Sequence, residues 1–403
     1  MPRAVSRTAA GEFSGEWPIN ARVVALMNMI APYQRPVYEA LGDRVSRLTV
    51  LVSKLMEGNR SWKPDVGRLD VRVQRALSLR RRWRHPAGFS EDVYLHVPWD
   101  TLWQLLRLRP DVIISGELGA RTVFGALYCL LSRRTLLIVG IGVSERTEQE
   151  RGRLRHALRQ WLLPRADLVF VNGANGERYA QRYGVRVDRI YRIPYVALPE
   201  FFAAGAQTRT RGSVRNLLYV GQLTDRKGLL PCVTALDEWA RTHPDEKIAF
   251  RVIGSGPVRD ALECFTPGGR LAIEVLGDQD PRSLPAFYAQ ADAFLFPTLA
   301  DEWGLVVHEA LVSGVPVIGS IHSQAVEELC QEGTNGWIFD PESETSMSAA
   351  LDRALTTTPD KLAAMRERAR AGAARLTPEW AADRMVAAIR AAIAERDGVA
   401  KPR

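Results

Sequence analysis

Short runs of apolar and β-branched residues alternate along this chain with segments of helical spacing. That alternation predicts parallel strands buried between layers of helices, which is the α/β class of fold. The predicted strands form two sets of five, at 22–29, 48–52, 112–115, 136–141 and 168–171, and at 216–220, 249–253, 273–276, 293–296 and 315–319. Ten short strands are too many for one compact sheet, so we expect two sheets.

The stretch 197–214 separates the two sets of strands. It is rich in Ala, Gly, Thr and Arg, lacks a clear period and begins near Pro199, so it is predicted to be an interdomain linker. We expect two doubly wound Rossmann-like domains, 19–196 and 215–377, that face each other across a cleft at the carboxyl ends of their strands. Residues 1–18 are predicted to form a flexible tail. Residues 378–403 are predicted to form a C-terminal helix that can cross back to the first domain.

Composition narrows the class of protein further. Of 403 residues, 46% are hydrophobic and 25% are charged, which is typical of a globular protein. The four cysteines include no C-x-x-C pair and predict neither a zinc ribbon nor a disulfide framework. The apolar stretch 123–143 is interrupted by Ser132, Arg133 and Arg134, so no spanning helix is expected there. We expect a cytoplasmic protein, either in solution or peripheral on the inner face of the plasma membrane.

The segment GQLTDRKG at 221–228 is the first candidate for chemistry. It follows a predicted strand and precedes a predicted helix at 229–241, so Arg226 and Lys227 lie beside the free N–H groups of a helix. Two cations next to backbone donors suit a diphosphate, because charge-assisted hydrogen bonds are the stronger ones. The alternative is that the Lys-Gly pair only ends a turn in solvent.

A second candidate lies between the predicted strand 293–296 and the helix 305–313. Asp301 and Glu302 occupy the loop, and Gly304 allows the backbone to approach a ligand closely. Glu309 lies about one turn inside the helix, whose amino end favours anions. Two acids therefore frame a phosphate-sized cradle, unless the loop acids are merely solvated.

Other turns are less specific. Gly254 and Gly256 form a Gly-x-Gly after a strand, which alone is more often a tight turn than a ligand site. The first strand-to-helix turn has no glycine, and Tyr33 or Arg35 there either contacts a substrate or packs. Glu117 follows the strand 112–115 and is the site candidate of the first domain; the alternative is an acid that only favours a helix start.

Five motifs in order resemble retaining glycosyltransferase family 4, which has the GT-B fold. They are G-x-L-x-x-x-K-G at 221–228, Gly254 to Pro257, Val275-Leu276-Gly277, the pair Asp301 and Glu309 with seven residues between, and ELCQEGTNG at 328–336. The resemblance extends over about 214–345. One departure is that the family most often has Glu where this chain has Asp301, which puts the donor sugar or its exact contact in doubt.

The resemblance implies a role for each matching residue. Arg226 and Lys227 would neutralise the diphosphate and the charge on the departing nucleotide. Glu309 would hold the ribose hydroxyls, and Asp301 would bind hydroxyls of the donor sugar. The expected donor site is completed by Gly221, Gly254, Gly256, Glu302, Trp303, the backbone N–H groups of Gly304, Leu305 and Val306, and a base-binding stretch at Val275, Leu276 and Gly277.

The function implied is sugar transfer from a nucleotide diphosphate sugar to a glycan or polyprenyl-linked acceptor, in the synthesis of exopolysaccharide, capsule or lipopolysaccharide. No metal and no cofactor are expected, because the six histidines show no ligand spacing. His308 and His322 remain weak candidates for donor contact. The alternatives are a non-hydrolysing nucleotide-sugar epimerase and a basic nucleic-acid-binding protein, although no recognition element supports the latter. A nicotinamide dehydrogenase is disfavoured because no G-x-G-x-x-G follows the first strand.

Two basic segments bear on the choice of partner. Lys plus Arg exceeds Asp plus Glu by 54 to 46, and only six of these bases are lysine. The segments 79–85 and 151–159, the latter followed by Trp161, mix arginine with tryptophan, which suits an anionic membrane surface. The alternative for the second segment is a helix with a core-facing stripe and a solvated basic back.

Overall fold

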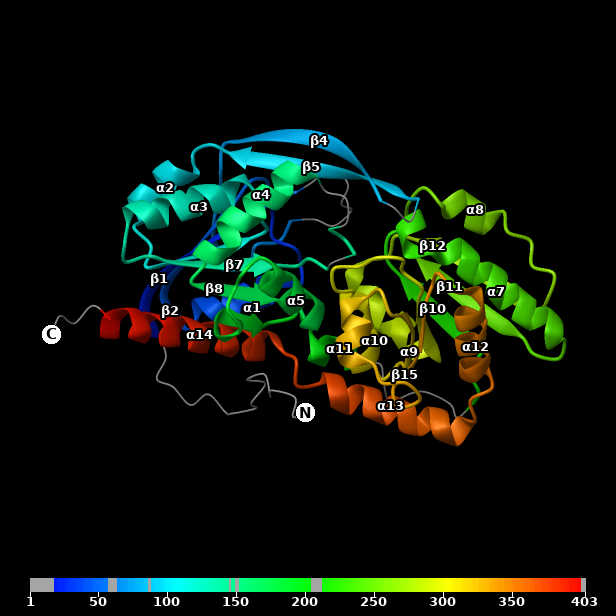
Figure 1. Ribbon diagram of the computed structural model, residues 1–403. Coiled ribbons are helices and arrows are strands. Elements are labelled where there is room, and N and C mark those ends of the chain that lie inside the picture. The colour runs from blue at the N-terminus through cyan, green and yellow to red at the C-terminus, as the bar shows by residue number, and fades with distance from the viewer. Residues whose placement is uncertain are drawn as a thin grey trace.

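The computed structural model describes residues 18–56, 64–85, 88–144, 146–148, 152–203 and 212–399. It has two α/β domains side by side, each built on its own parallel sheet (Figure 1). The two-domain Rossmann-like architecture expected from the sequence is therefore confirmed. The predicted tail, except for Pro18, lies outside the described residues.

The first domain contains a seven-stranded parallel sheet in the order β3-β2-β1-β6-β7-β8-β9. Its strands are β1 (Ile19–Met27), β2 (Val45–Val52), β3 (Asp70–Val73), β6 (Val112–Gly116), β7 (Leu136–Ile141), β8 (Leu168–Val171) and β9 (Ile190–Arg192). Its helical segments are α1 (Gln34–Gly42), α2 (Thr101–Leu108), α3 (Ala120–Leu131), α4 (Arg153–Leu162), η1 (Leu163–Arg165), α5 (Ala174–Arg182) and η2 (Val187–Arg189). The central strands are buried on both faces, which explains their continuous apolar runs.

An antiparallel hairpin, β4 (Ala76–Arg84) and β5 (Ser90–Pro98), stands apart from this sheet. In Figure 1 it extends along the top of the first domain towards the second. The hydrophobic pattern did not predict it, because β4 is rich in arginine and mostly exposed. The basic segment 79–85 is thus largely a strand of this hairpin.

The second domain contains a six-stranded parallel sheet in the order β12-β11-β10-β13-β14-β15. Its strands are β10 (Asn216–Val220), β11 (Ile248–Ile253), β12 (Leu271–Gly277), β13 (Ala293–Phe296), β14 (Val317–Ser320) and β15 (Gly336–Phe339). Its helical segments are η4 (Asp225–Lys227), α7 (Leu229–Thr242), α8 (Arg259–Glu263), η5 (Pro281–Ser283), α9 (Leu284–Gln290), α10 (Leu305–Val312), α11 (Gln324–Leu329), α12 (Glu344–Leu355) and α13 (Pro359–Ala373). Because β10 and β13 are neighbours, the loops that follow them lie side by side.

Two segments outside the domain cores differ in how they pack. The predicted linker contains a short helix, α6 (Pro199–Ala203), whose Phe202 is buried in the core of the second domain. The last helix, α14 (Pro378–Val399), lies against the first domain, as Figure 1 shows. Its Met385, Val386 and Ile389 belong to the same hydrophobic core as residues of β1 and β2, so this helix packs on the first domain.

Direct hydrogen bonds join the two domains near the carboxyl ends of their strands. Glu328 of α11 accepts from the backbone N–H of Ala174 at 2.5 Å, and Gln324 accepts from that of Gly176 at 3.1 Å. These acceptors meet the amino end of α5, where N–H groups lack partners within the helix. None of the helices in the described part of the chain has the length and apolar character needed to cross a membrane.

Candidate functional site

The turn after β10 places two cations at the carboxyl end of that strand. Arg226 and Lys227 occupy the single turn η4, and Gly228 ends it with a φ of +65°. A Cβ on Gly228 would lie 2.2 Å from the carbonyl oxygen of Pro297, so only glycine lets this turn reach the end of β13. The Lys227 side chain is only 11% exposed.

Asp301 meets both cations. Its carboxylate forms an ion pair with Lys227, and the same oxygen lies 3.6 Å from Nη1 of Arg226. Arg226 also donates to the carbonyl of Ala300 at 2.7 Å, which fixes the loop. Burial alone would raise the pKa of Asp301, but Lys227 and Arg226 outweigh it and hold that pKa below its usual range. The cluster therefore holds two positive charges and one negative, and its net positive charge favours an anion.

Glu309 lies in the first turns of α10, beyond Gly304, which begins the helix with a φ of +95°. Tyr288 of α9 donates its hydroxyl proton to the Glu309 carboxylate at 2.9 Å. Burial raises the pKa of Glu309 to about 7, and the Tyr288 hydrogen bond offsets only part of that effect. Glu309 is thus a proton-exchanging group near neutral pH, which the sequence alone did not predict.

The glycine turns bring three strand ends into contact. A Cβ on Gly254 would lie 1.8 Å from the carbonyl oxygen of Gly221, and the Gly254 N–H donates to Gly277 at 2.9 Å. The ends of β10, β11 and β12 are therefore packed backbone to backbone. This arrangement gathers Gly221, Gly254 and Gly277, which the sequence analysis had placed at one site, and half-buried Val275 and Leu276 lie on the last of these strands.

The two loop acids point in different directions. Asp301 is held on the cations, whereas the exposed Glu302 lies towards the first domain, where a Cβ on Gly142 would lie 3.4 Å from its carboxylate. Tyr195 lies beside the same glycine and packs its ring 5.2 Å from that of Tyr33. Of the two acids, Asp301 is the one joined to the cation pair.

In the first domain, Glu117 has an unusual backbone. Its φ of +87° is rare for a residue with a Cβ and marks local strain. Asn28, at the end of β1, donates a hydrogen bond to the Glu117 carboxylate, and Arg121 donates to the Asn28 side chain. Arg121 is only 3% exposed and also donates to Ser53 at 3.0 Å. Asn28 and Arg121 were not singled out in the sequence, because neither lies in a recognised motif.

The structure also shows the surroundings of three other residues named from the sequence. Trp303 is 2% exposed and belongs to the core of the second domain, so its side chain is not at the surface of a ligand site. His308 is fully buried; its Nδ1 accepts from the Ala197 N–H and its Nε2 faces the Ala373 carbonyl, so it joins the linker to α13. Arg35 pairs with Asp65.

The fold also brings together ligands that are distant in sequence. His322, Asp340 and Glu342 have their ligand atoms within 4.8 Å of one another, an arrangement able to hold a metal ion. The Glu342 carboxylate is also paired with Arg146 of the first domain, which donates to the Leu299 carbonyl at 2.7 Å. Burial and the charge of Arg146 lower the pKa of His322. Spacing along the sequence could not reveal this group.

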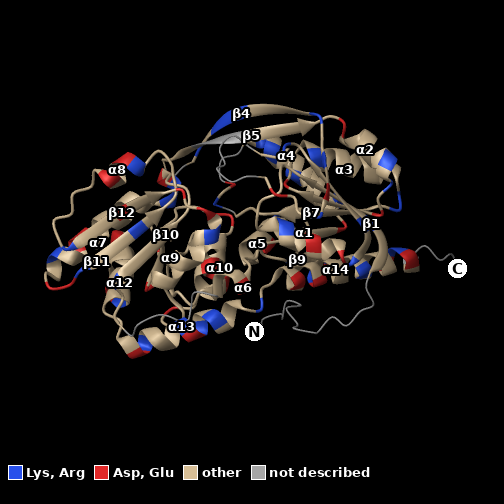
Figure 2. Ribbon diagram, turned by 180° about the vertical axis from the view of Figure 1, so that it is seen from behind, with Lys and Arg blue, Asp and Glu red and all other residues tan. Residues whose placement is uncertain are grey.

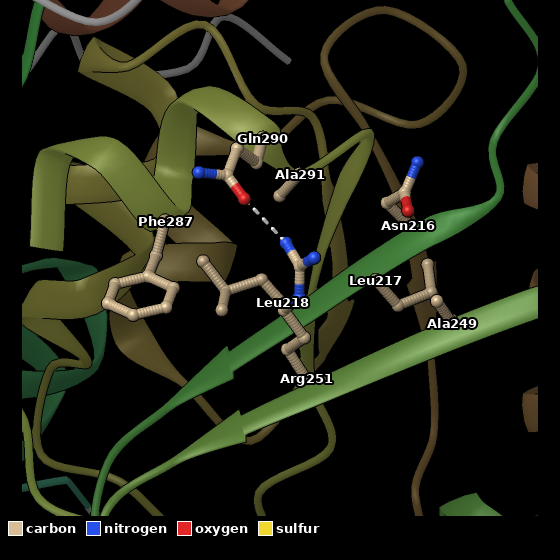
Figure 3. A pocket seen from close by; sticks show the side chains of 8 residues that line it. All are labelled: Asn216, Leu217, Leu218, Ala249, Arg251, Phe287, Gln290 and Ala291. Carbon is tan, nitrogen blue, oxygen red and sulfur yellow. Dashed lines mark hydrogen bonds between the residues drawn. The ribbon is translucent and has the colours of Figure 1, made fainter. Parts of the chain in front are cut away.

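A small hollow at the opposite edge of the sheet is separate from these residues. Figure 3 shows it lined by the amino-terminal parts of β10 and β11 together with α9. Arg251 donates to Gln290 at 2.8 Å across it. Because ligands of doubly wound sheets bind at the carboxyl ends of strands, this hollow is not the candidate site.

Comparison with known proteins places this geometry in context. Residues 205–372 match the family described as Glycosyl transferases group 1, and residues 30–196 match the Glycosyl transferase 4-like domain. A glycogen synthase of Mycobacterium tuberculosis is 30% identical over 230 residues, which cover 56% of this chain and 53% of that protein. The match thus spans about half the length of that curated relative.

Two solved structures share the fold across nearly the whole chain. The Anabaena protein HepE in complex with UDP has a TM-score of 0.67 and 15% identity, covering 92% of this chain and 100% of that one. A lipopolysaccharide outer core galactosyltransferase in its apo form also has a TM-score of 0.67, with 11% identity and coverages of 92% and 99%. At these identities the likeness concerns the fold.

Proposed function

Because this chain belongs to the family 4 type of glycosyltransferases with the GT-B fold, we propose that it transfers a sugar from a nucleotide diphosphate sugar to a hydroxyl group. The observation that supports this most directly is the buried cluster of Arg226, Lys227 and Asp301. It offers a net positive charge beside the amino end of α10, where a diphosphate gains both charge pairing and backbone donors.

The proposed roles follow from these contacts. The diphosphate takes the two cations, which stabilise the charge that grows on the departing nucleotide. Asp301 stays next to them and accepts from hydroxyls of the donor sugar, and Glu309 holds the ribose. The base lies against Val275, Leu276 and Gly277. In this proposal the anomeric configuration is retained and no metal ion takes part, so activity survives EDTA.

The acceptor in this proposal is a glycan or a polyprenyl-linked glycan used for cell-surface polysaccharide. A relative in Salmonella typhimurium, described as a putative colanic acid biosynthesis glycosyltransferase and 27% identical over 188 residues, supports that direction. A lipid-linked acceptor would bring the enzyme to the inner face of the plasma membrane as a peripheral protein. Glu117, Asn28 and Arg121 are the first-domain groups proposed to meet the acceptor.

Donor binding and turnover test the site. Calorimetry with UDP, GDP, ADP and TDP identifies the base, and hydrolysis of a donor panel without acceptor identifies the sugar. We expect Lys227→Ala to lower turnover by about 10²- to 10³-fold, the usual cost of removing one charge-stabilising donor. Lys247→Ala, which removes an exposed lysine from the same domain, is the matched control and leaves turnover unchanged.

Several outcomes would contradict the proposal. Near wild-type turnover in Lys227→Ala would reject the site, and the absence of heat with all four nucleotides would reject the donor. An epimerised donor, detected by mass and chromatography without acceptor, would favour the epimerase instead. Loss of activity in EDTA that zinc or magnesium restores would reject metal independence and direct attention to His322, Asp340 and Glu342.

A further inference from the structure

The two domains differ sharply in the apolar surface that they expose. Among the described residues, sixteen large hydrophobic side chains are exposed; thirteen lie within 19–196 and one, Ile321, lies within 215–377. Scattered exposed leucines are normal, but concentration in one region of one domain marks an interaction surface. Ten of the thirteen lie between Val73 and Leu131.

The hairpin contributes the first part of this surface. Leu77 pairs with Val97 across the two strands and Leu79 pairs with Leu95, so these four side chains share one face. Leu77 is 58% exposed, Leu79 49% and Leu95 48%. We call these four residues the hairpin face. Helix α3 packs against β5, so the hairpin is supported from one side, and its exposed apolar face is open to a partner.

Helix α2 and the turn before it continue the surface with aromatic rings. Trp99 and Trp103 are more than half exposed, and arginines lie over them: Arg75 is 5.7 Å from the Trp99 ring and Arg107 is 3.6 Å from the Trp103 ring. Helix α3 packs against both α2 and β5, so these elements adjoin the hairpin. Both views place the hairpin, α2 and α3 along the same side of the first domain (Figures 1 and 2). Tryptophan stacked with arginine is suited to the boundary between lipid headgroups and acyl chains.

Charge separates the two domains in the same way. Residues 19–196 contain 30 Lys and Arg against 16 Asp and Glu, whereas residues 215–377 contain 15 against 23. The small excess of basic over acidic residues in the whole chain is therefore the sum of a strongly basic first domain and an acidic second domain. An anionic surface attracts the first domain and repels the second, which would orient the molecule.

We propose that the hairpin face, with Trp99, Trp103 and the arginines around them, docks on an anionic lipid bilayer. The leucines and tryptophans enter the headgroup boundary, the arginines pair with lipid phosphates, and the acidic domain stays in water. The inference rests on the proposed function only in naming the purpose of docking, which is to meet a lipid-linked acceptor. Docking itself requires neither donor nor turnover, so the two can fail separately.

Vesicle sedimentation of the full chain tests the surface. We expect binding to vesicles of phosphatidylcholine with about 30 mol % phosphatidylglycerol and weak binding to phosphatidylcholine alone. The triple change Leu77→Ser, Leu79→Ser and Leu95→Ser should weaken binding at least about tenfold, because three partly exposed leucines lose their lipid contact. Each basic side chain contributes about fivefold near such a surface. We therefore expect a larger loss when three arginines become serine: Arg81, which shares the hairpin face, and Arg75 and Arg107, which lie over the tryptophans.

Matched controls make the outcome decisive. The same charge loss in the acidic domain, through serine at the exposed Arg270, Arg282 and Arg353, should leave vesicle binding unchanged. Donor hydrolysis without lipid should be unchanged in the leucine variant, which shows that it is folded. Wild-type protein that hydrolyses donor but does not sediment with the anionic vesicles would overturn the proposal. So would full binding by the leucine variant, or a concentration-dependent dimer that this variant abolishes, because a second copy would then be the partner.

Discussion

The two domains of this protein share one type of fold but differ in their loops, in the burial of their charged residues and in their outer surfaces. Both are built on parallel strands buried on two faces, yet the second has Lys227 buried and Arg226, Asp301 and Glu309 half-buried, while the first has an exposed Glu117 and an apolar, basic surface. The turn after β10 and the turn after β11 need glycine, and the turn after β1 has none. The buried strands determine the architecture, and the loops and outer faces determine what each domain can bind.

The largest expected effect tests the backbone contacts of the second domain. Gly254→Ala places a Cβ 1.8 Å from the Gly221 carbonyl at a φ of +134°, and neither strand end can move away cheaply. Strain and overpacking together should lower the free energy of unfolding by about 4 kcal/mol. Chemical denaturation followed by intrinsic fluorescence measures this loss, and nucleotide binding should be lost with it.

The first domain supplies the matched control. Gly119 begins α3 after the Glu117 turn, and a Cβ there meets no atom within 4 Å. Gly119→Ala should therefore change the free energy of unfolding by less than about 1 kcal/mol. Equal losses in the two variants would show that the close backbone contact at Gly254 has no special cost.

The central strands of both sheets could be predicted because their signal is local. The predicted bounds at 136–141, 168–171, 216–220 and 293–296 match β7, β8, β10 and β13. The hairpin was missed because an arginine-rich strand has no apolar run, and its alternation is visible only once the partner strand is known. The edge strands β3 and β9 were missed because each contains an arginine and is exposed or half-buried, so neither has an apolar run; β15 was missed although it is largely buried.

The site could be predicted only in part, because several of its contacts join segments that are distant in the sequence. Lys227 and Asp301 could be assigned to one donor site in advance, because both lie in motifs that resemble the family. The Tyr288 contact to Glu309 depends on how α9 packs on α10, and the burial of Trp303 depends on the whole core. Arg146 comes from a loop of the other domain, so nothing local to the site indicates it.

A smaller effect tests the environment of the buried acid in the second domain. The pKa of Glu309 is raised from 4.5 to about 7 by burial. Below pH 4.5 the carboxyl group is protonated in both the folded and the unfolded chain, so its burial does not lower the free energy of unfolding. As the pH rises to 7 the unfolded chain releases a proton that the folded chain keeps, so stability falls, by on the order of 3 kcal/mol in total. Denaturation between pH 4 and pH 8 should show this loss in the wild type, and Glu309→Gln should remove it.

An acid-to-amide change in the first domain is the counterpart of Glu309→Gln. The Glu117 side chain is 58% exposed, so Glu117→Gln serves as the matched acid-to-amide control at an exposed position. If Glu309→Gln kept the wild-type slope between pH 4.5 and 7, Glu309 would not be the group that causes the pH dependence, and its pKa would not be raised.

The smallest effect concerns Arg146, an arginine that connects the first domain to the Asp301 loop. Arg146 donates to the Leu299 carbonyl at 2.7 Å and pairs with Glu342, so it ties the first domain to the loop that ends in Asp301. Its loss removes a charge-assisted bond at a partly exposed site, worth about 1 kcal/mol, and should raise the KM for donor by about fivefold with less effect on kcat. Arg178→Ala is the control, because it breaks another interdomain ion pair, to Glu327 at 3.1 Å, on α11 rather than on that loop. Steady-state kinetics of both variants separate the two roles: an equal rise in KM would mean that any interdomain contact suffices, and a rise confined to Arg146→Ala would mean that the first domain positions the Asp301 loop directly.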